Sequence, residues 1–112
     1  MPRESLEHSF WVGRVAKYFE NKGYDVTREH PVKGNSAIDI LAKRGSKHVA
    51  VEIETGKSDI KTNLKKIAET KFARAILVAT SPNAVTACQK AVDSVKKSDL
   101  TKIELLSWLD IS

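Results

Sequence analysis

The sequence of 112 residues has few of the features that mark secreted, membrane-bound or multidomain proteins. Its one cysteine, Cys88, excludes an internal disulfide, and no apolar run approaches the roughly 18 residues of a membrane span. No signal peptide opens the chain, and no repeat, low-complexity tract or linker interrupts it. We therefore expect one cytoplasmic domain over residues 1–112, with no membrane partner.

Histidine and cysteine do not indicate a metal site. His8, His30 and His48 lack the spacing of metal ligands. Cys88 falls at helical spacing with Val92, which favours a small buried apolar residue over a reactive thiol. A metal site in this chain would have to be built from oxygen ligands.

A phosphate-binding loop is also disfavoured. The tripeptide at 56–58 reads Gly-Lys-Ser, but a P-loop needs a second glycine five residues before Gly56. Position 51 holds Val51 instead. A nucleotide-binding function therefore lacks its defining residue.

The most informative residues present are acids on either side of a turn at 44–47. The runs Ala37–Lys43 and His48–Glu54 alternate like half-buried strands, and Gly-Ser is a favoured two-residue hairpin loop. The hairpin predicts three opposed pairs: Arg44 with Lys47, Leu41 with Ala50, and Asp39 with Glu52. Opposed residues share a face, and Glu54 joins that face two residues on. Three carboxylates are thus expected to converge.

Converging carboxylates repel one another, so they predict a cation between them. Carboxylate oxygens with waters and substrate phosphates make a typical magnesium site, and such sites serve phosphoryl chemistry. Alternatively, the acids line a solvated sheet face. Ala37, Leu41 and Ala50 on the same face favour partial burial instead.

Hydrophobic periodicity and capping residues predict the remaining elements. The expected order is a helix over Arg3–Asn21, a strand over Tyr24–Glu29, a loop over His30–Ser36, the hairpin, a helix from Ser58 or Asp59 to about Thr70, a strand over Ala75–Ala79, a helix from Pro82 to about Lys97 and a strand over Lys102–Leu106. A hairpin followed by helical crossovers gives an α/β fold, with a mixed central sheet flanked by helices.

The charge balance is compatible with a nucleic-acid partner. The chain has 19 basic and 14 acidic residues, a net charge of +5. Lysines gather around the hairpin and on the helix that follows, where Lys61, Lys65 and Lys66 are expected to face outward. Lysine-rich surfaces also serve solubility alone, so the charge supports a DNA partner only together with the acids.

The acidic hairpin and the element order together resemble the PD-(D/E)XK nuclease superfamily, the restriction-endonuclease-like fold. The match rests on Ile38-Asp39-Ile40, on its spacing to Val51-Glu52-Ile53-Glu54, and on Glu7 in the first helix. The resemblance spans nearly the whole chain. Within the superfamily, the chain is most similar to the small Holliday-junction resolvases of archaea and viruses. This resemblance implies an αβββαβ(αβ) core and a magnesium- or manganese-dependent endonuclease.

Carried over by position, the resemblance implies that Asp39 and Glu52 bind metal, with the Ile53 carbonyl as a further ligand and Glu7 assisting from the first helix. The superfamily's lysine should stand at position 54, where this chain has Glu54. Some restriction endonucleases of the superfamily carry glutamate there and remain active.

Two interpretations of position 54 remain open. Glu54 could be a further metal ligand or accept a proton from water. Alternatively, Lys57 could supply the missing positive charge by reaching back toward the phosphate. Asn35 and Ser36 could contact the scissile phosphate, or serve an ordinary turn. The lysines, among them Lys57, Lys61 and Lys65, would hold the DNA backbone without reading sequence.

The sequence therefore predicts an endonuclease that hydrolyses DNA phosphodiester bonds, with branched DNA among its substrates. The alternative is a nuclease-fold nucleic-acid-binding module that has lost catalysis, or a subunit of a larger DNA-processing assembly. A homodimer is expected because coordinated cleavage of two strands needs two sites. The apolar C-terminal segment is a candidate contact, or it closes the core of the monomer: Leu105, Leu106, Trp108, Leu109 and Ile111.

Overall fold

The computed structural model describes residues 5–32, 36–56, 59–69, 72, 74–94 and 102–111. Its elements are α1 (Leu6–Asn21), β1 (Asp25–Val32), β2 (Ser36–Arg44), β3 (Lys47–Glu54), α2 (Ile60–Glu69), β4 (Arg74–Ala79), α3 (Pro82–Ser94), β5 (Lys102–Ser107) and a final 3-10 turn, η2 (Trp108–Asp110). Five strands form one sheet in the order β1-β2-β3-β4-β5, antiparallel up to β3 and parallel beyond it. The predicted α/β class with a mixed, helix-flanked sheet is confirmed.

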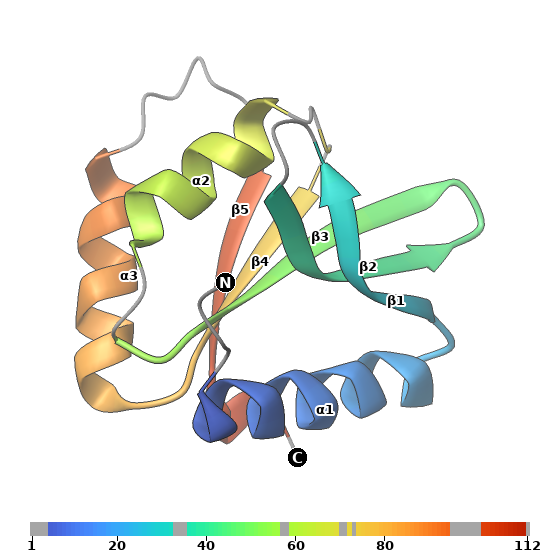
Figure 1. Ribbon diagram of the computed structural model, residues 1–112, viewed down its shortest axis with the longest axis horizontal. Coiled ribbons are helices and arrows are strands. Elements are labelled where there is room, and N and C mark those ends of the chain that lie inside the picture. Colours follow the sequence, from blue (N-terminus) through green and yellow to red (C-terminus); the bar gives the residue numbers. More distant parts are fainter. Residues whose placement is uncertain are drawn as a thin grey trace.

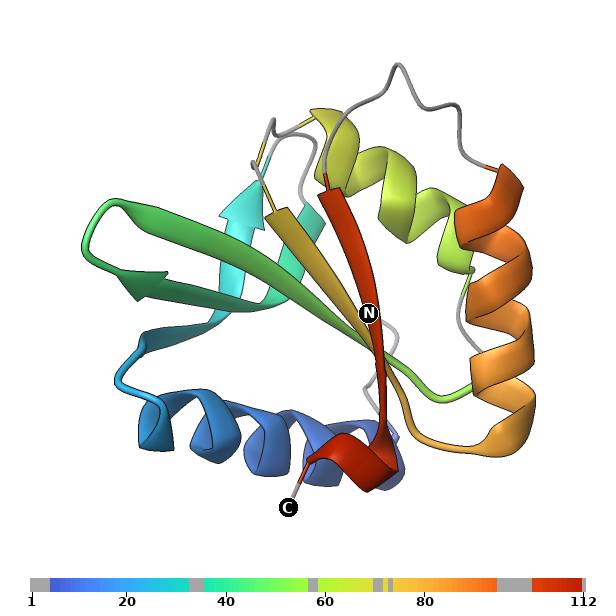
Figure 2. The ribbon, with the colours of Figure 1, turned by 180° about the vertical axis from the view of Figure 1, so that it is seen from behind.

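The sheet lies between two helical layers. Helix α1 runs along one face, whereas α2 and α3 lie on the other (Figure 1). Figure 2 shows the same arrangement from behind, with η2 returning the chain to the side of α1. Both crossovers after β3 therefore pass over the face that α1 leaves open.

The face toward α1 holds the larger core. On β3 the odd-numbered residues Val49, Val51 and Ile53 point to this side and pack with residues of α1 such as Val15 and Phe19. All five are at most 3% exposed. Strand alternation explains the pattern, because every second side chain of a strand shares a face.

The opposite face is divided between two smaller clusters. Leu77 and Ala79 of β4 pack with Cys88 of α3, while Ala50 and Ala75 pack with Ile67 of α2. The even-numbered positions of β3 that face this side continue with Glu52 and Glu54, the buried charged residues of the described part of the chain. The predicted burial of Cys88 is confirmed at 0% exposure.

Capping side chains fix where the helices begin. Ser5 Oγ accepts a hydrogen bond from the His8 backbone N–H at 3.0 Å, so α1 begins at Leu6. Asp59 Oδ1 accepts from the Thr62 N–H at 3.1 Å, which confirms Asp59 as a cap of α2. Ser81 Oγ accepts from the Ala84 N–H at 3.2 Å, as the Ser-Pro pair predicts.

The predicted loop over His30–Ser36 is wrong at both ends. β1 continues to Val32 and β2 begins at Ser36, with Pro31 opposite Ala37 in the pairing. Pro31 is tolerated because β1 is an edge strand, where a missing N–H breaks no pairing with an outer neighbour. The longer β1 supports the beginning of β2, which carries Asp39.

The C-terminal segment closes the monomer's core in large part. Ile111 is 3% exposed and lies in the α1-side cluster, against which Leu106 packs, while Leu105 packs on the other face. Leu109 stays 73% exposed. The homodimer remains a prediction. In the described part of the chain, the helices are too short or too polar to span a membrane.

Candidate active site at the β2–β3 fork

The predicted hairpin register is confirmed where the two strands pair. Arg44 lies opposite Lys47, and Leu41 lies opposite Ala50. Pairing then ends at Ile40 and Val51, although β2 begins at Ser36 and β3 continues to Glu54. β2 bends here (Figure 1), and it pairs with β1 from Ser36 to Lys43 but with β3 only from Ile40 to Arg44. We call this point, with Asp39, Glu52 and Ile53, the fork.

At the fork, side chains replace the ladder hydrogen bonds. The Ile53 N–H donates to Asp39 Oδ2 at 2.8 Å, and the Asp39 N–H donates to Glu52 Oε2 at 3.3 Å. The two predicted metal-binding carboxylates are thus held together by the backbone of the opposite strand. Their predicted proximity is confirmed, and metal binding by them stays a prediction.

Each face of the sheet contributes a basic side chain to the fork. His8 Nε2 of α1 lies 3.2 Å from Asp39 Oδ2. Lys66 Nζ of α2 lies 2.7 Å from Glu52 Oε1. The two contacts fix one carboxylate toward α1 and the other toward α2.

The two carboxyl groups have opposite pKa shifts. Burial alone would raise the pKa of Asp39, but hydrogen bonds, foremost the one with His8, hold it below its ordinary value. Burial and the nearby charge of Asp39 raise the pKa of Glu52 to about 8, although Lys66 opposes this shift. Asp39 is therefore the carboxyl group that ionises more readily, and Glu52 keeps a proton to a higher pH than an ordinary glutamate does.

Contrary to the expectation from the sequence, Glu54 does not join Asp39 and Glu52. It is 0% exposed and lies on the same face of β3 as Glu52, but its Oε1 accepts a hydrogen bond from Asn63 Nδ2 at 2.8 Å. Within the described ranges, no three His, Cys, Asp or Glu side chains are grouped so that they could hold a metal ion. The expected convergence of three carboxylates is met only by Asp39 and Glu52, because α2 engages Glu54.

The remaining predicted site residues lie in different settings. Glu7 is exposed, and its neighbour His8 makes the contact to Asp39. Ser36, Lys61 and Lys65 are exposed. Two further predicted residues lie outside the described ranges: Asn35 and Lys57.

Sequence reasoning missed three residues that the structure brings to the acids. Lys66 was expected to face outward, which is wrong, since its ammonium lies on Glu52 and its side chain is 17% exposed. Asn63 and His8 had no assigned role. Helical spacing carries the signal for both: His8 lies four residues before the buried Val12, and Asn63 lies four before the buried Ile67.

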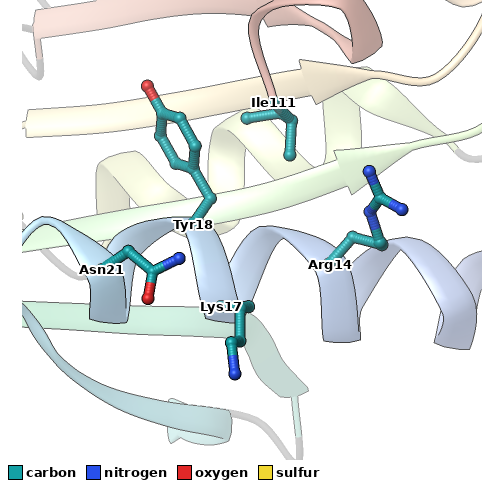
Figure 3. Close-up of a pocket in the computed structure, with 5 residues that line it drawn as sticks. All are labelled: Arg14, Lys17, Tyr18, Asn21 and Ile111. Carbon is teal, nitrogen blue, oxygen red and sulfur yellow. The ribbon is translucent and has the colours of Figure 1, made fainter.

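A separate hollow of about 270 Å³ lies beside α1 (Figure 3). Its lining comes from one helix and the C-terminal end: Arg14, Lys17, Tyr18, Asn21 and Ile111. None of the residues at the fork takes part in it. The carboxylates therefore form a distinct site.

Comparisons with known proteins identify a fold but no family. No known family and no curated protein matches this sequence. Among solved structures, the chain is similar to a protein of unknown function, AF1548, with 16% identity and a TM-score of 0.58 over 88% of this chain. The match covers 57% of that structure, so this chain spans little more than half its length. At this identity the likeness shows the fold alone.

Proposed function

We propose that this chain is a metal-dependent endonuclease of the PD-(D/E)XK type that hydrolyses DNA phosphodiester bonds, with branched DNA among its substrates. The observation that carries the proposal is the fork, where Asp39 and Glu52 are joined through backbone hydrogen bonds. A fold gains nothing from placing two acids side by side in a buried place. A binding site for a hard cation would explain why both carboxyl groups lie there.

The donor set at the fork fits Mg²⁺ or Mn²⁺. Magnesium is commonly held by one or two protein carboxylates, with waters and substrate phosphates as its other ligands. Asp39 and Glu52 would be those carboxylates, and the Ile53 carbonyl remains the expected backbone ligand. When bound, the cation would screen the phosphate charge, activate water and stabilise the leaving oxygen. His8, in contact with Asp39, would orient that carboxylate.

The protein's own residues would position the substrate and the ions. The exposed Lys61 and Lys65 on α2 lie on the helix that also reaches the fork through Lys66, so a DNA backbone along α2 would pass the acids. Such contacts are sensitive to salt and carry no sequence information. Glu54, held by Asn63, would take part as a ligand or proton acceptor only after turning from that amide. A DNA substrate also agrees with the expected cytoplasmic location.

Isosteric variants test the site. Asp39→Asn and Glu52→Gln keep the shape of the fork, but each removes a carboxyl group that would bind a cation. We expect each to lower single-turnover cleavage of linear and four-way-junction DNA by about a thousandfold or more, with DNA affinity changed by less than about threefold. Glu104→Gln is the matched control, since Glu104 on β5 pairs with Arg74 on β4 rather than with the fork. Cleavage at the unmodified rate by pure Asp39→Asn protein would refute the proposal.

A second candidate is a nuclease-fold binding module without catalysis, for which Glu54 in place of lysine is the specific reason. Calorimetric titration with Mn²⁺ followed by incubation with duplex and junction DNA separates the two functions. Metal uptake and DNA binding without cut product would favour the binding module. Metal uptake with product that disappears in the Asp39→Asn protein would favour the nuclease.

A further inference from the structure

Lys66 places a positive charge inside the candidate active site from an unexpected element. Its Nζ lies 2.7 Å from Glu52 Oε1 and donates a hydrogen bond to the Ala37 carbonyl at 2.7 Å. A weaker hydrogen bond of 3.4 Å joins it to Asn63 Oδ1 on the same helix. The ammonium therefore bridges α2, the beginning of β2 and the buried end of β3.

The strand position at which the superfamily carries its lysine is occupied by an acid. Glu54 is fully buried and bonded to Asn63, one helical turn before Lys66. Asn63 of α2 thus contacts Glu54 of β3, and Lys66 of α2 contacts Glu52 of β3. A lysine side chain at position 54 would point toward the amide of Asn63. The amino group that lies near the carboxylates is that of Lys66 on α2.

We propose that Lys66 is the catalytic lysine of this protein, taking over from α2 the role that position 54 lacks. The inference rests on the proposed nuclease function. It gives the site a cation that Lys57 was expected to supply. Lys66 already contacts Glu52.

The role requires only that Lys66 donate hydrogen bonds. In the hydrolysis, the water oxygen forms a bond to phosphorus and gives up a proton, while the bond from phosphorus to the leaving sugar oxygen breaks and that oxygen takes up a proton. Lys66 stays charged throughout and donates to the phosphate oxygen or to the attacking water. Its flexible four-carbon stem and three donors allow it to turn from Glu52 to the phosphate.

The competing explanation is that Lys66 is a structural counter-ion of Glu52. A counter-ion would matter for stability, and any cation that pairs with Glu52 would serve. A catalytic lysine would matter for the chemical step, and the geometry of its donors would count. The two roles therefore predict different results for Lys66→Met, for Lys66→Arg and for a lysine moved to the strand.

The experiment compares Lys66→Met, Lys66→Arg and the double variant Lys66→Met with Glu54→Lys. Lys90→Met, which removes one exposed charge from α3, is the matched control. We expect Lys66→Met to lower the single-turnover cleavage rate by about 10²–10³-fold, the usual effect of losing one preorganised donor. Mn²⁺ affinity measured by calorimetry without DNA should stay within about tenfold, because the carboxylates remain. Lys66→Arg should lose at least about tenfold in rate.

The double variant gives the decisive result. A lysine returned to position 54 should restore cleavage at least about tenfold over Lys66→Met, which a lost structural ion pair would not explain. Full activity of Lys66→Met or of Lys66→Arg would overturn the proposal. Loss of Mn²⁺ binding in parallel with cleavage, without rescue by the lysine at 54, would also overturn it and assign a structural role.

The outcome separates this inference from the proposed function. If the unmodified protein cleaves and Asp39→Asn does not, while Lys66→Met cleaves normally, only the role of Lys66 fails. If the unmodified protein takes up Mn²⁺ but cuts no DNA, the nuclease function fails and the catalytic role of Lys66 falls with it. If Lys66→Met does not fold, Lys66→Arg decides alone, because it keeps a cation beside Glu52.

Discussion

The two faces of β3 differ in what they bury. Toward α1 the strand presents Val49, Val51 and Ile53, all within one apolar cluster. Toward α2 and α3 it presents Ala50 and then two buried glutamates, which are at most 1% exposed. The first face explains why the chain folds, because burial of apolar side chains stabilises the sheet. The second face carries groups that folding alone would exclude.

Side chains of α2 reduce the free-energy cost of burying Glu52 and Glu54, but they do not remove that cost. Lys66 pairs with Glu52, and Asn63 donates to Glu54. A buried ion pair seldom stabilises a fold more than apolar side chains of the same volume would. The comparison thus predicts that mutations on the two faces of the same strand change stability in opposite directions.

The largest effect is expected on the apolar face. Ile53→Ala removes a side chain that is 1% exposed and lies in the α1-side cluster, while its backbone N–H can still bond Asp39. We expect a loss of about 2–5 kcal/mol in the free energy of unfolding, measured by urea denaturation. Leu109→Ala, at a position 73% exposed, is the control and should change stability by less than about 0.5 kcal/mol. A loss below about 1 kcal/mol for Ile53→Ala would contradict the importance of this face.

A smaller effect of opposite sign is expected on the acidic face. Burial and Asp39 raise the pKa of Glu52 to about 8, so the folded protein holds a proton that the unfolded chain releases near its ordinary pKa. Glu52 therefore lowers stability increasingly as the pH rises from about 5 to 8. With metal removed by EDTA, Glu52→Gln should be more stable than the unmodified protein by roughly 1–3 kcal/mol at pH 8, and close to it at pH 5.

The measurement for Glu52→Gln is urea denaturation at several pH values. The quantity of interest is the free energy of unfolding of Glu52→Gln minus that of the unmodified protein. If this difference does not change with pH, or is smaller at pH 8 than at pH 5, then burying Glu52 does not destabilise the fold. Glu104→Gln again serves as control. Hydrogen bonds to Arg74 lower the pKa of Glu104, so its contribution is present at neutral pH and is lost toward acid.

The sequence predicted the fold well because its signals were local. The Gly-Ser turn fixed the hairpin register that brings Asp39 to Glu52, and Ser81-Pro82 fixed the start of α3. The final turn η2 and the length of β1 were missed. In β1, proline indicated a loop, whereas its edge position in the sheet removes the penalty.

Half of the site depended on contacts between distant elements, which periodicity does not encode. The strand residues Asp39 and Glu52 could be predicted, because alternation and register place them. Lys66 and His8 come from helices whose rotation over the sheet is set by packing. The pattern of lysines on α2 predicted that Lys66 would face solvent. The packing of α2 against β3 places its ammonium on Glu52 instead.

The smallest expected effect tests whether the acidic face is closed to water. Cys88 of α3 lies in the cluster on this face, and burial, with a smaller contribution from Glu54, raises the pKa of its thiol to about 12. Because the thiolate is the reactive form, labelling by a disulfide reagent at pH 8 should be at least about a hundredfold slower in the folded protein than in urea. Ile53→Ala should speed labelling by opening the fold more often. Rapid labelling of the folded protein would show that water reaches this face, and the difference between the two faces of β3 would then not be one of burial.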